Sequence, residues 1–285
     1  MIAVACLLFA MGSVTTGAAI AKGLFGAVGA EGATFLRNGF GSLMLLAFWR
    51  PWRQGWPSGR HALVLLIYGV NLCLMNLLYY ISLRTLPLGL AVAIEFLGPF
   101  SLALFNSRRW TDIVWLAFAL GGLAMLLPWG EGTMAVDPVG AAYALSAGAA
   151  WAFYIVFGQK AGRMMPGGRV TSIGTFIAAL LLFPIGWNAA GPALFGLSTL
   201  GGALALGLFS CVIPYSMDMV AMKRLPLRTF GILMSVEPAI GALSGFLLLG
   251  EALSLRQQFA IACVIVASFG STASARQVMP VTPEN

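Results

Sequence analysis

Residues 87–106 read PLGLAVAIEFLGPFSLALFN, an apolar run that is long enough to cross a bilayer and carries one carboxylate, Glu95, near its middle. A charge at the bilayer centre costs about 3 kcal/mol even on lenient insertion scales, so acids there usually face a cavity or a partner. Glu95 therefore predicts a functional polar site. The alternative is a structural ion pair between Glu95 and a neighbouring Arg or Lys.

Pro99 follows four residues after Glu95 in the same run. Because proline has no N–H, the carbonyl of Glu95 loses its helical donor. The side chain and the backbone oxygen of Glu95 then both lack a helical partner at one depth. This is typical of transporters whose broken helices form a polar site inside the membrane, and we expect a helix break here.

The composition of the chain predicts a polytopic membrane protein. Of its 285 residues, 60% are hydrophobic and 9% are charged, whereas a soluble domain has roughly 25% charged residues. The four cysteines are scattered singly through apolar segments, so neither a disulfide framework nor a metal site is predicted, and no cofactor is expected.

Hydropathy divides the chain into ten expected spans with short linkers. The first is expected to be an anchor and not a removable signal peptide, because no basic segment precedes it and nine more spans follow. Asp137-Pro138 predicts a helix N-cap, and Ser254 with Gln257 predicts a capping box, whereas Glu251 is interpreted as an interfacial loop acid. The expected spans are residues 2–21, 30–49, 61–83, 87–106, 112–129, 138–159, 170–189, 199–222, 226–249 and 255–275.

The basic residues indicate the orientation. With a cytoplasmic N-terminus, the inward segments hold twelve of them and the outward loops hold three, Lys22, Arg84 and Arg256. This positive-inside asymmetry predicts that both termini are cytoplasmic, and it explains the net charge of +7 without a nucleic-acid partner. The twelve are Arg50, Arg53, Arg60, Arg108, Arg109, Lys160, Arg163, Arg169, Lys223, Arg224, Arg228 and Arg276.

An internal repeat divides the chain into two halves. Residues 84–88 (RTLPL) recur as residues 223–227 (KRLPL), at an offset of 139, and a second proline follows twelve residues after each first one, at Pro99 and Pro238. Five spans per half is an odd number, so the halves would enter the membrane in opposite directions. Such inverted repeats are typical of secondary transporters. The predicted fold class is an all-α membrane protein with ten transmembrane helices in two inverted five-helix repeats, residues 1–132 and 133–285.

Other ionisable and polar groups inside the spans are candidates for the same site. Arg37 is interpreted as a partner for Glu95 or for a substrate carboxylate, or as an arginine that reaches the interface. Asp218, near Lys223 and Arg224, predicts an interfacial ion pair, and Gly241 with Gly245 predicts helix packing. The remaining candidates would line a substrate cavity or bond between helices, and they are Asn71, Asn76, Tyr79, Tyr80, Trp151, Tyr154, Ser210, Pro214, Tyr215, Ser216 and Glu237.

Enzymatic motifs do not occur in the sequence. The one histidine, His61, lies at the mouth of a span, and HExxH, P-loop and GxSxG patterns are absent. Transport would therefore be driven by an ion gradient or run downhill. The other classes left open are an exporter of another metabolite or drug, an uncoupled facilitator, an intramembrane enzyme and a non-transporting receptor or scaffold.

Three stretches resemble a known family. Residues 21–53, 76–115 and 228–254, with AVAIEFLGP and SVEPA inside them, are similar to EamA-type members of the drug/metabolite transporter superfamily, and within it to the bacterial inner-membrane threonine/homoserine exporters. The resemblance covers nearly the whole chain. It implies ten spans in two inverted repeats, a central cavity, and proton-coupled efflux of small amino acids, with Glu95, Pro99, Glu237 and Pro238 on matching positions.

The residues and the resemblance together give a binding hypothesis. A zwitterionic amino acid needs a partner for each charge in a low-dielectric cavity. We expect Glu95 to receive the ammonium group and Arg37, or helix N-terminal N–H groups, to receive the carboxylate. A proton would compete with the ammonium group for Glu95. Helix breaks at Pro99, Pro214 and Pro238 would shape the site, and the protein would work in the bilayer as a monomer or a weak homodimer.

Overall fold

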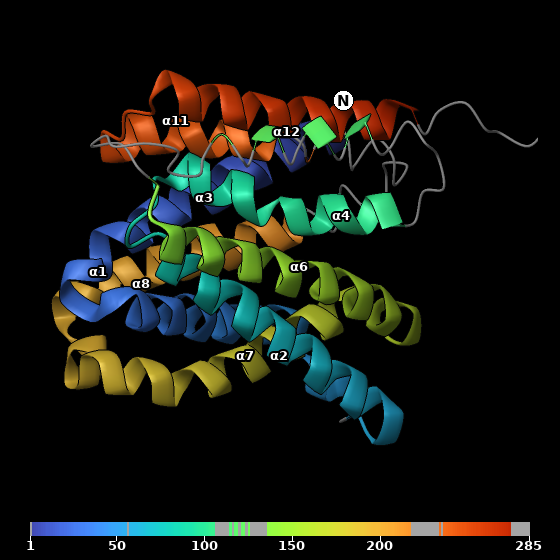
Figure 1. The fold of residues 1–285 in the computed structure, drawn as a ribbon. Coiled ribbons are helices and arrows are strands. Elements are labelled where there is room, and N and C mark those ends of the chain that lie inside the picture. Colours follow the sequence, from blue (N-terminus) through green and yellow to red (C-terminus); the bar gives the residue numbers. More distant parts are fainter. Residues whose placement is uncertain are drawn as a thin grey trace, which may run out of the picture.

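The computed structural model describes residues 2–55, 57–105, 114–115, 117–118, 121–122, 125, 136–217, 234 and 236–274. These residues form a bundle of helices, and no strand occurs in that part of the chain. In Figure 1, α3, α4 and α6 run through the middle of the bundle, with α11 and α12 above them and α7 below. The helices are α1 Ile2–Trp49, α2 Gly59–Ser82, α3 Leu88–Glu95, α4 Leu97–Phe105, α6 Pro138–Met164, α7 Gly167–Ala190, α8 Leu197–Gly207, α11 Glu237–Leu249 and α12 Leu255–Ser274, with short 3-10 helices at Pro51–Gln54 and Gly191–Phe195.

Five helices of the described chain are long and apolar enough to cross a membrane. The first such stretch, Val4–Trp49, has 46 residues, which at 1.5 Å per residue is about 69 Å, more than twice the hydrocarbon thickness of ~30 Å. Gly29 interrupts it with φ 68° and ψ 174°, a conformation that glycine adopts without strain. The ribbon of α1 bends back on itself at the left of Figure 1, so α1 contains both of the first two predicted spans.

Helix starts follow the sequence signals closely. The side chain of Asp137 accepts hydrogen bonds from two N–H groups in the first turn of α6, at 3.2 and 2.8 Å, and Pro138 occupies the same turn. Ser254 and Gln257 form the reciprocal bonds of a capping box at the start of α12. Both predictions are confirmed.

The loop predicted after the first span is wrong. The sequence places Lys22 in that loop, but α1 stays helical past Lys22, and its backbone leaves helical geometry at Gly29. The reason is local: residues 22–28 contain no proline, and the one conformation that ends the first pass requires a positive φ, which Gly29 supplies.

Glycine at two crossings brings helix backbones into direct contact. A Cβ built on Gly98 of α4 would lie 1.9 Å from the carbonyl oxygen of Gly148 in α6, and one built on Gly148 would lie 2.4 Å from the carbonyl oxygen of Glu95. Gly241 of α11 packs on Val92 of α3, as its predicted packing role requires. Small residues therefore bring α6 and α11 close to the segment that carries Glu95.

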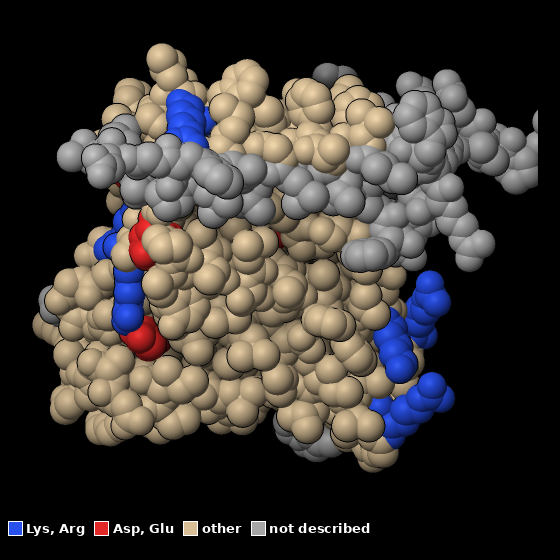
Figure 2. Space-filling model, in the orientation of Figure 1, with Lys and Arg blue, Asp and Glu red and all other residues tan. Residues whose placement is uncertain are grey.

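Charged residues gather at two opposite ends of the bundle. Figure 2 shows blue and red atoms together at the left edge and blue atoms alone at the right edge. The described ion pairs, Lys22–Glu251 and Arg84–Glu31, belong to the mixed-charge end. The basic end holds the close of α6 and the start of α2, with Arg60, Lys160 and Arg163. Arg108, Arg109, Asp218, Lys223, Arg224, Arg228 and Arg276 lie outside the described residues.

Candidate functional site

Arg37 lies at the centre of a buried polar group. Its side chain belongs to the second pass of α1 and is 5% exposed. Nη1 donates to Oδ1 of Asn76 in α2, Nη2 donates to the carbonyl oxygen of Ser210 at 2.9 Å, and the guanidinium carbon lies 5.5 Å from the centroid of the Tyr80 ring. Asn76 is held in turn, because its Nδ2 donates to the carbonyl of Leu72 at 2.7 Å.

This arrangement corrects two of the three interpretations of Arg37. The side chain is buried, so it does not reach the interface. It also makes no ion pair with Glu95, since no acidic side chain of the described chain lies within 4.0 Å of its nitrogens. The two charges still attract each other over a longer distance. The third interpretation, a partner for a substrate carboxylate, stays a prediction.

Glu95 lies at the helix break that Pro99 predicted. It is the last residue of α3, Phe96 forms a turn, and α4 begins at Leu97, so the break falls three residues before Pro99. Glu95 is 8% exposed, and within the described chain its carboxylate makes no hydrogen bond or ion pair. Its carbonyl oxygen faces Gly148 of α6, where the absence of a side chain admits it.

Glu237 and Pro238 form a comparable start of a helix in the second half of the chain. Val236 is a turn, Glu237 is the first residue of α11, and Pro238 lies in its first turn. Glu237 is 9% exposed, and its charge repels that of Glu95. Tyr79 of α2 interacts electrostatically with both acids and with Arg37. The structure therefore brings four of the predicted site residues into one region.

The predicted aromatic residues divide into two clusters. Trp151 of α6 packs on Phe96 at the break, with ring centroids 6.1 Å apart. Tyr154, three residues further on, instead stacks on Tyr68 of α2, with centroids 4.9 Å apart and the two hydroxyls at 3.1 Å. Tyr215 packs with Tyr154 against an apolar cluster of α2 and α7. Trp151 and Tyr154 thus share a helix face but contact different neighbours.

The third predicted break coincides with a change of helix type. Residues Leu208–Val212 form a π-helical turn after α8, and Pro214 follows two residues later. Sequence reasoning missed this turn, and it also missed Tyr68 and Asn38, whose Oδ1 accepts from Asn76 at 3.4 Å. Asn38 follows Arg37 directly in an apolar span, so its position was a signal. Tyr68 offered none, because its partner lies 86 residues away.

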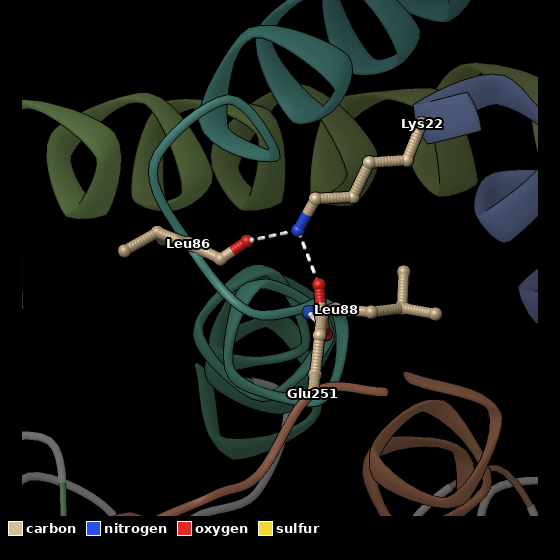
Figure 3. Close-up of polar contacts among 4 residues, drawn as sticks. All are labelled: Lys22, Leu86, Leu88 and Glu251. Atoms are coloured by element: carbon tan, nitrogen blue, oxygen red, sulfur yellow. Dashed lines mark hydrogen bonds and ion pairs between the residues drawn. The ribbon is translucent and has the colours of Figure 1, made fainter. Parts of the chain in front are cut away.

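At the mixed-charge end, Lys22 and Glu251 bind the backbone at the start of α3, as Figure 3 shows. Lys22 donates to the carbonyl of Leu86 at 3.1 Å and forms an ion pair with Oε1 of Glu251, while Oε2 of Glu251 accepts from the N–H of Leu88 at 2.7 Å. Glu251 is therefore more than the loop acid predicted, because it caps α3 and joins it to α1. A hollow of about 200 Å³ beside this contact is lined in part by Leu86.

The sequence of the chain matches a family of transporters. The EamA-like transporter family matches residues 138–273, and the chain belongs to this family. It is a family of multi-pass membrane transporters and not of enzymes. The threonine/homoserine exporter RhtA of Escherichia coli K12 is 49% identical over 271 residues, which cover 95% of this chain and 91% of that protein.

Other comparisons extend this result. The uncharacterized transporter YwfM of Bacillus subtilis is 26% identical over 251 residues, which cover 83% of this chain and 82% of that protein. A protein of known crystal structure superposes with a TM-score of 0.63 at 21% identity, covering 96% of this chain and 98% of that one. At this identity, the superposition shows the fold alone.

Proposed function

We propose that this protein is an inner-membrane secondary transporter that exports small amino acids such as threonine and homoserine. The observation that carries the proposal is the 49% identity to a threonine/homoserine exporter over 95% of the chain. The buried polar group of Arg37, Asn76 and Tyr80 adds a chemical reason, because it offers a fixed positive charge to a substrate carboxylate inside an apolar bundle.

The proposed architecture has ten helices in two inverted five-helix repeats, residues 1–132 and 133–285. Two features support it. The family match, residues 138–273, falls within the second of these units. The break between α3 and α4 and the turn before α11 also stand near prolines that are 139 residues apart in the sequence, Pro99 and Pro238. The basic end of the bundle would face the cytoplasm, together with both termini.

The proposed binding mode uses the two charges of a zwitterion. Arg37 receives the carboxylate, because its described partners are neutral and no described acid neutralises it. Glu95 receives the ammonium group, since its carboxylate is buried beside the break and has no hydrogen-bond partner of its own in the described chain. The residues proposed to surround this region from α2, α6, α11 and the segment after α8 are Asn76, Tyr79, Trp151, Tyr154, Tyr215 and Glu237.

Coupling to protons follows from competition at Glu95. A carboxylate that holds an ammonium group cannot hold a proton at the same time, so protonation of Glu95 from the outside would release the substrate. Inward return of the protonated carrier then completes an antiport cycle.

The experiment compares Glu95→Gln with Glu31→Gln in proteoliposomes that contain the purified chain and labelled L-threonine. Glu31 lies at the mixed-charge end, paired with Arg84, and serves as the matched control. We expect an imposed proton gradient to drive threonine flux with the native chain and with Glu31→Gln, and we expect Glu95→Gln to lose this flux although the protein inserts. Full proton-driven flux in Glu95→Gln would refute the role of Glu95.

The same vesicles test the substrate class. A panel of unlabelled homoserine, serine, bulky amino acids and a cationic drug competes for threonine flux. We expect competition by the small amino acids, and competition by the drug alone would replace the proposed function by drug export.

A further inference from the structure

Pro214 removes a backbone donor next to the π-helical turn. In an α-helix, the N–H of residue 214 would bond the carbonyl of Ser210, four residues earlier, and in a π-helix it would bond that of Phe209, five residues earlier. The π geometry of Leu208–Val212 includes the bond from the N–H of Ile213 to the carbonyl of Leu208. Because proline has no N–H, residue 214 cannot donate to the carbonyl of Phe209 or to that of Ser210.

Both of these carbonyls accept hydrogen bonds from side chains of α1. The hydroxyl of Ser13 donates to the carbonyl of Phe209 at 2.7 Å, and Nη2 of Arg37 donates to the carbonyl of Ser210 at 2.9 Å. Ser13 and Arg37 lie on opposite sides of Gly29, in the two passes of α1. The stretch before the proline is therefore bound by both passes of α1.

Close packing fixes this stretch against α1. A Cβ added to Gly17 would lie 1.9 Å from the hydroxyl oxygen of Ser210, and one added to Gly41 would lie 2.6 Å from the Cβ of Cys211. These glycines let the π-helical turn pack directly on both passes of α1. The carbonyl of Ser210 therefore lies within hydrogen-bond distance of the guanidinium of Arg37.

The acceptors determine how the guanidinium is oriented. One hydrogen bond on each Nη, to Asn76 and to Ser210, and the ring of Tyr80 define the plane of the group. Nε of Arg37 is fully buried and has no hydrogen-bond partner in the described part of the chain. A planar guanidinium held in this way presents its remaining N–H groups in the fork geometry that a carboxylate accepts.

We propose that Pro214 is a positioning residue: it reserves the carbonyl of Ser210 for Arg37 and so sets the orientation in which Arg37 receives the substrate carboxylate. The inference rests on the proposed function of Arg37. An N–H at position 214 allows the stretch to return to α geometry, in which this N–H bonds the Ser210 carbonyl within the helix. Arg37 then loses one anchor, and the chain discriminates less between substrates with and without a carboxylate.

The test uses the full chain in proteoliposomes, with L-threonine as substrate and L-threoninol, which lacks the carboxylate, as competitor. Pro214→Ala and Pro214→Gly both restore the N–H, and the glycine variant also tolerates π geometry. Pro184→Ala is the matched control, because Pro184 lies inside α7 and the residue four positions before it, Leu180, is 57% exposed. Arg37→Gln reports on the proposed function itself.

We expect both Pro214 variants to raise the KM for threonine about tenfold, the size of losing one hydrogen bond to a charged group, with the maximal rate and the inhibition constant of threoninol unchanged. Pro184→Ala should change none of them. A reduced maximal rate at unchanged KM, or misfolding of both Pro214 variants, would show that Pro214 serves the fold and would overturn the inference. If Arg37→Gln keeps the preference for threonine, the proposed carboxylate site fails; if only the Pro214 variants keep it, the positioning role fails.

Discussion

Lys22 and Arg37 are cations of the same helix, one on each side of Gly29, and their surroundings are opposite. The Lys22 side chain is 24% exposed and pairs with Glu251, itself bound to the N–H of Leu88. Arg37 is 5% exposed, and its described partners are an amide oxygen, a backbone carbonyl and an aromatic ring. One positive charge is balanced by an acid, and the other is held by neutral groups.

The difference separates a structural contact from the proposed binding site. An ion pair at a helix end stabilises the fold and needs nothing further. A buried guanidinium that no described acid balances is costly, and in a membrane bundle such a group usually marks a functional site. The cost of burying Arg37 is consistent with a charge that a substrate carboxylate completes, as proposed above. Lys22 instead joins α1 to the start of α3.

The packing around the two cations gives the largest expected difference. Gly41 lies one turn beyond Arg37, and a Cβ there would meet Cys211 at 2.6 Å, whereas a Cβ on Gly23, beside Lys22, would meet nothing within 4 Å. We expect Gly41→Ala to destabilise the protein by about 1–2 kcal/mol, because overpacking outweighs the better helix propensity of alanine. Gly23→Ala should stabilise it by about 0.5–1 kcal/mol.

Thermal unfolding of the purified variants in one detergent measures both effects. The unfolding midpoint should fall for Gly41→Ala and rise for Gly23→Ala. If the two midpoints move in the same direction, the surroundings of Arg37 are no tighter than those of Lys22, and the contrast between them is lost.

The next largest expected difference between the surroundings of Lys22 and Arg37 is how the stability of the variants depends on salt. We expect Lys22→Gln to lower stability by about 0.5 kcal/mol at low ionic strength, because the pair with Glu251 is partly exposed. The loss should vanish near ~1 M salt, where charges are screened over ~3 Å. The Gly41→Ala defect is steric and should persist at every salt concentration.

Lys160→Gln is the matched control for this measurement. Lys160 lies 5.9 Å from the centroid of the Phe157 ring and has no ion pair in the described chain. Its removal should leave the unfolding midpoint unchanged at low salt. A salt-independent defect in Lys22→Gln would mean that packing of the lysine stem, and not its charge, joins α1 to α3.

The parts of the fold that the sequence predicts are those with local causes. The Asp137 cap and the Ser254 capping box each involve residues within three positions of one another, so the pattern alone specifies them. The break beside Glu95 follows from Pro99 in the same way. The helical state of Lys22 is not predicted, because the turn after the first pass depends on Gly29, and nothing in the pattern distinguishes this glycine from the others nearby.

The candidate site can be predicted as a set of residues but not as a set of contacts. Arg37, Asn76 and Glu95 are identifiable because polar groups are costly in an apolar span. Their partners are not, because the bond from Arg37 to Ser210 spans 173 residues, and the carbonyl that it uses is invisible to side-chain patterns. The one available signal was Pro214, four residues after Ser210, because a proline there removes the α-helical donor of that carbonyl.

The smallest expected effect is a loss of stability at acidic pH. It tests whether the contact of Asp137 contributes to stability only while its carboxylate is ionised. The hydroxyl of Thr85, which donates to Oδ2 of Asp137 at 2.7 Å, and then the N–H of Gly140 lower the pKa of Asp137. A lowered pKa means that this contact stabilises the fold fully above the ordinary aspartate value and stops doing so as the pH falls through the folded-state value. Asp137→Asn still caps α6 but cannot ionise.

We therefore expect the native chain to be slightly more stable than Asp137→Asn at neutral pH, and the difference to shrink below about pH 4 and then disappear. Unfolding midpoints measured between neutral and acidic pH give this difference directly. Thr85→Ala removes the largest cause of the lowered pKa, so its difference from the native chain should close over the same range. Gly41→Ala should show no such closure, because its defect is steric. If the Gly41→Ala defect closed as well, the closure would not be specific to this contact and could not be assigned to the titration of Asp137.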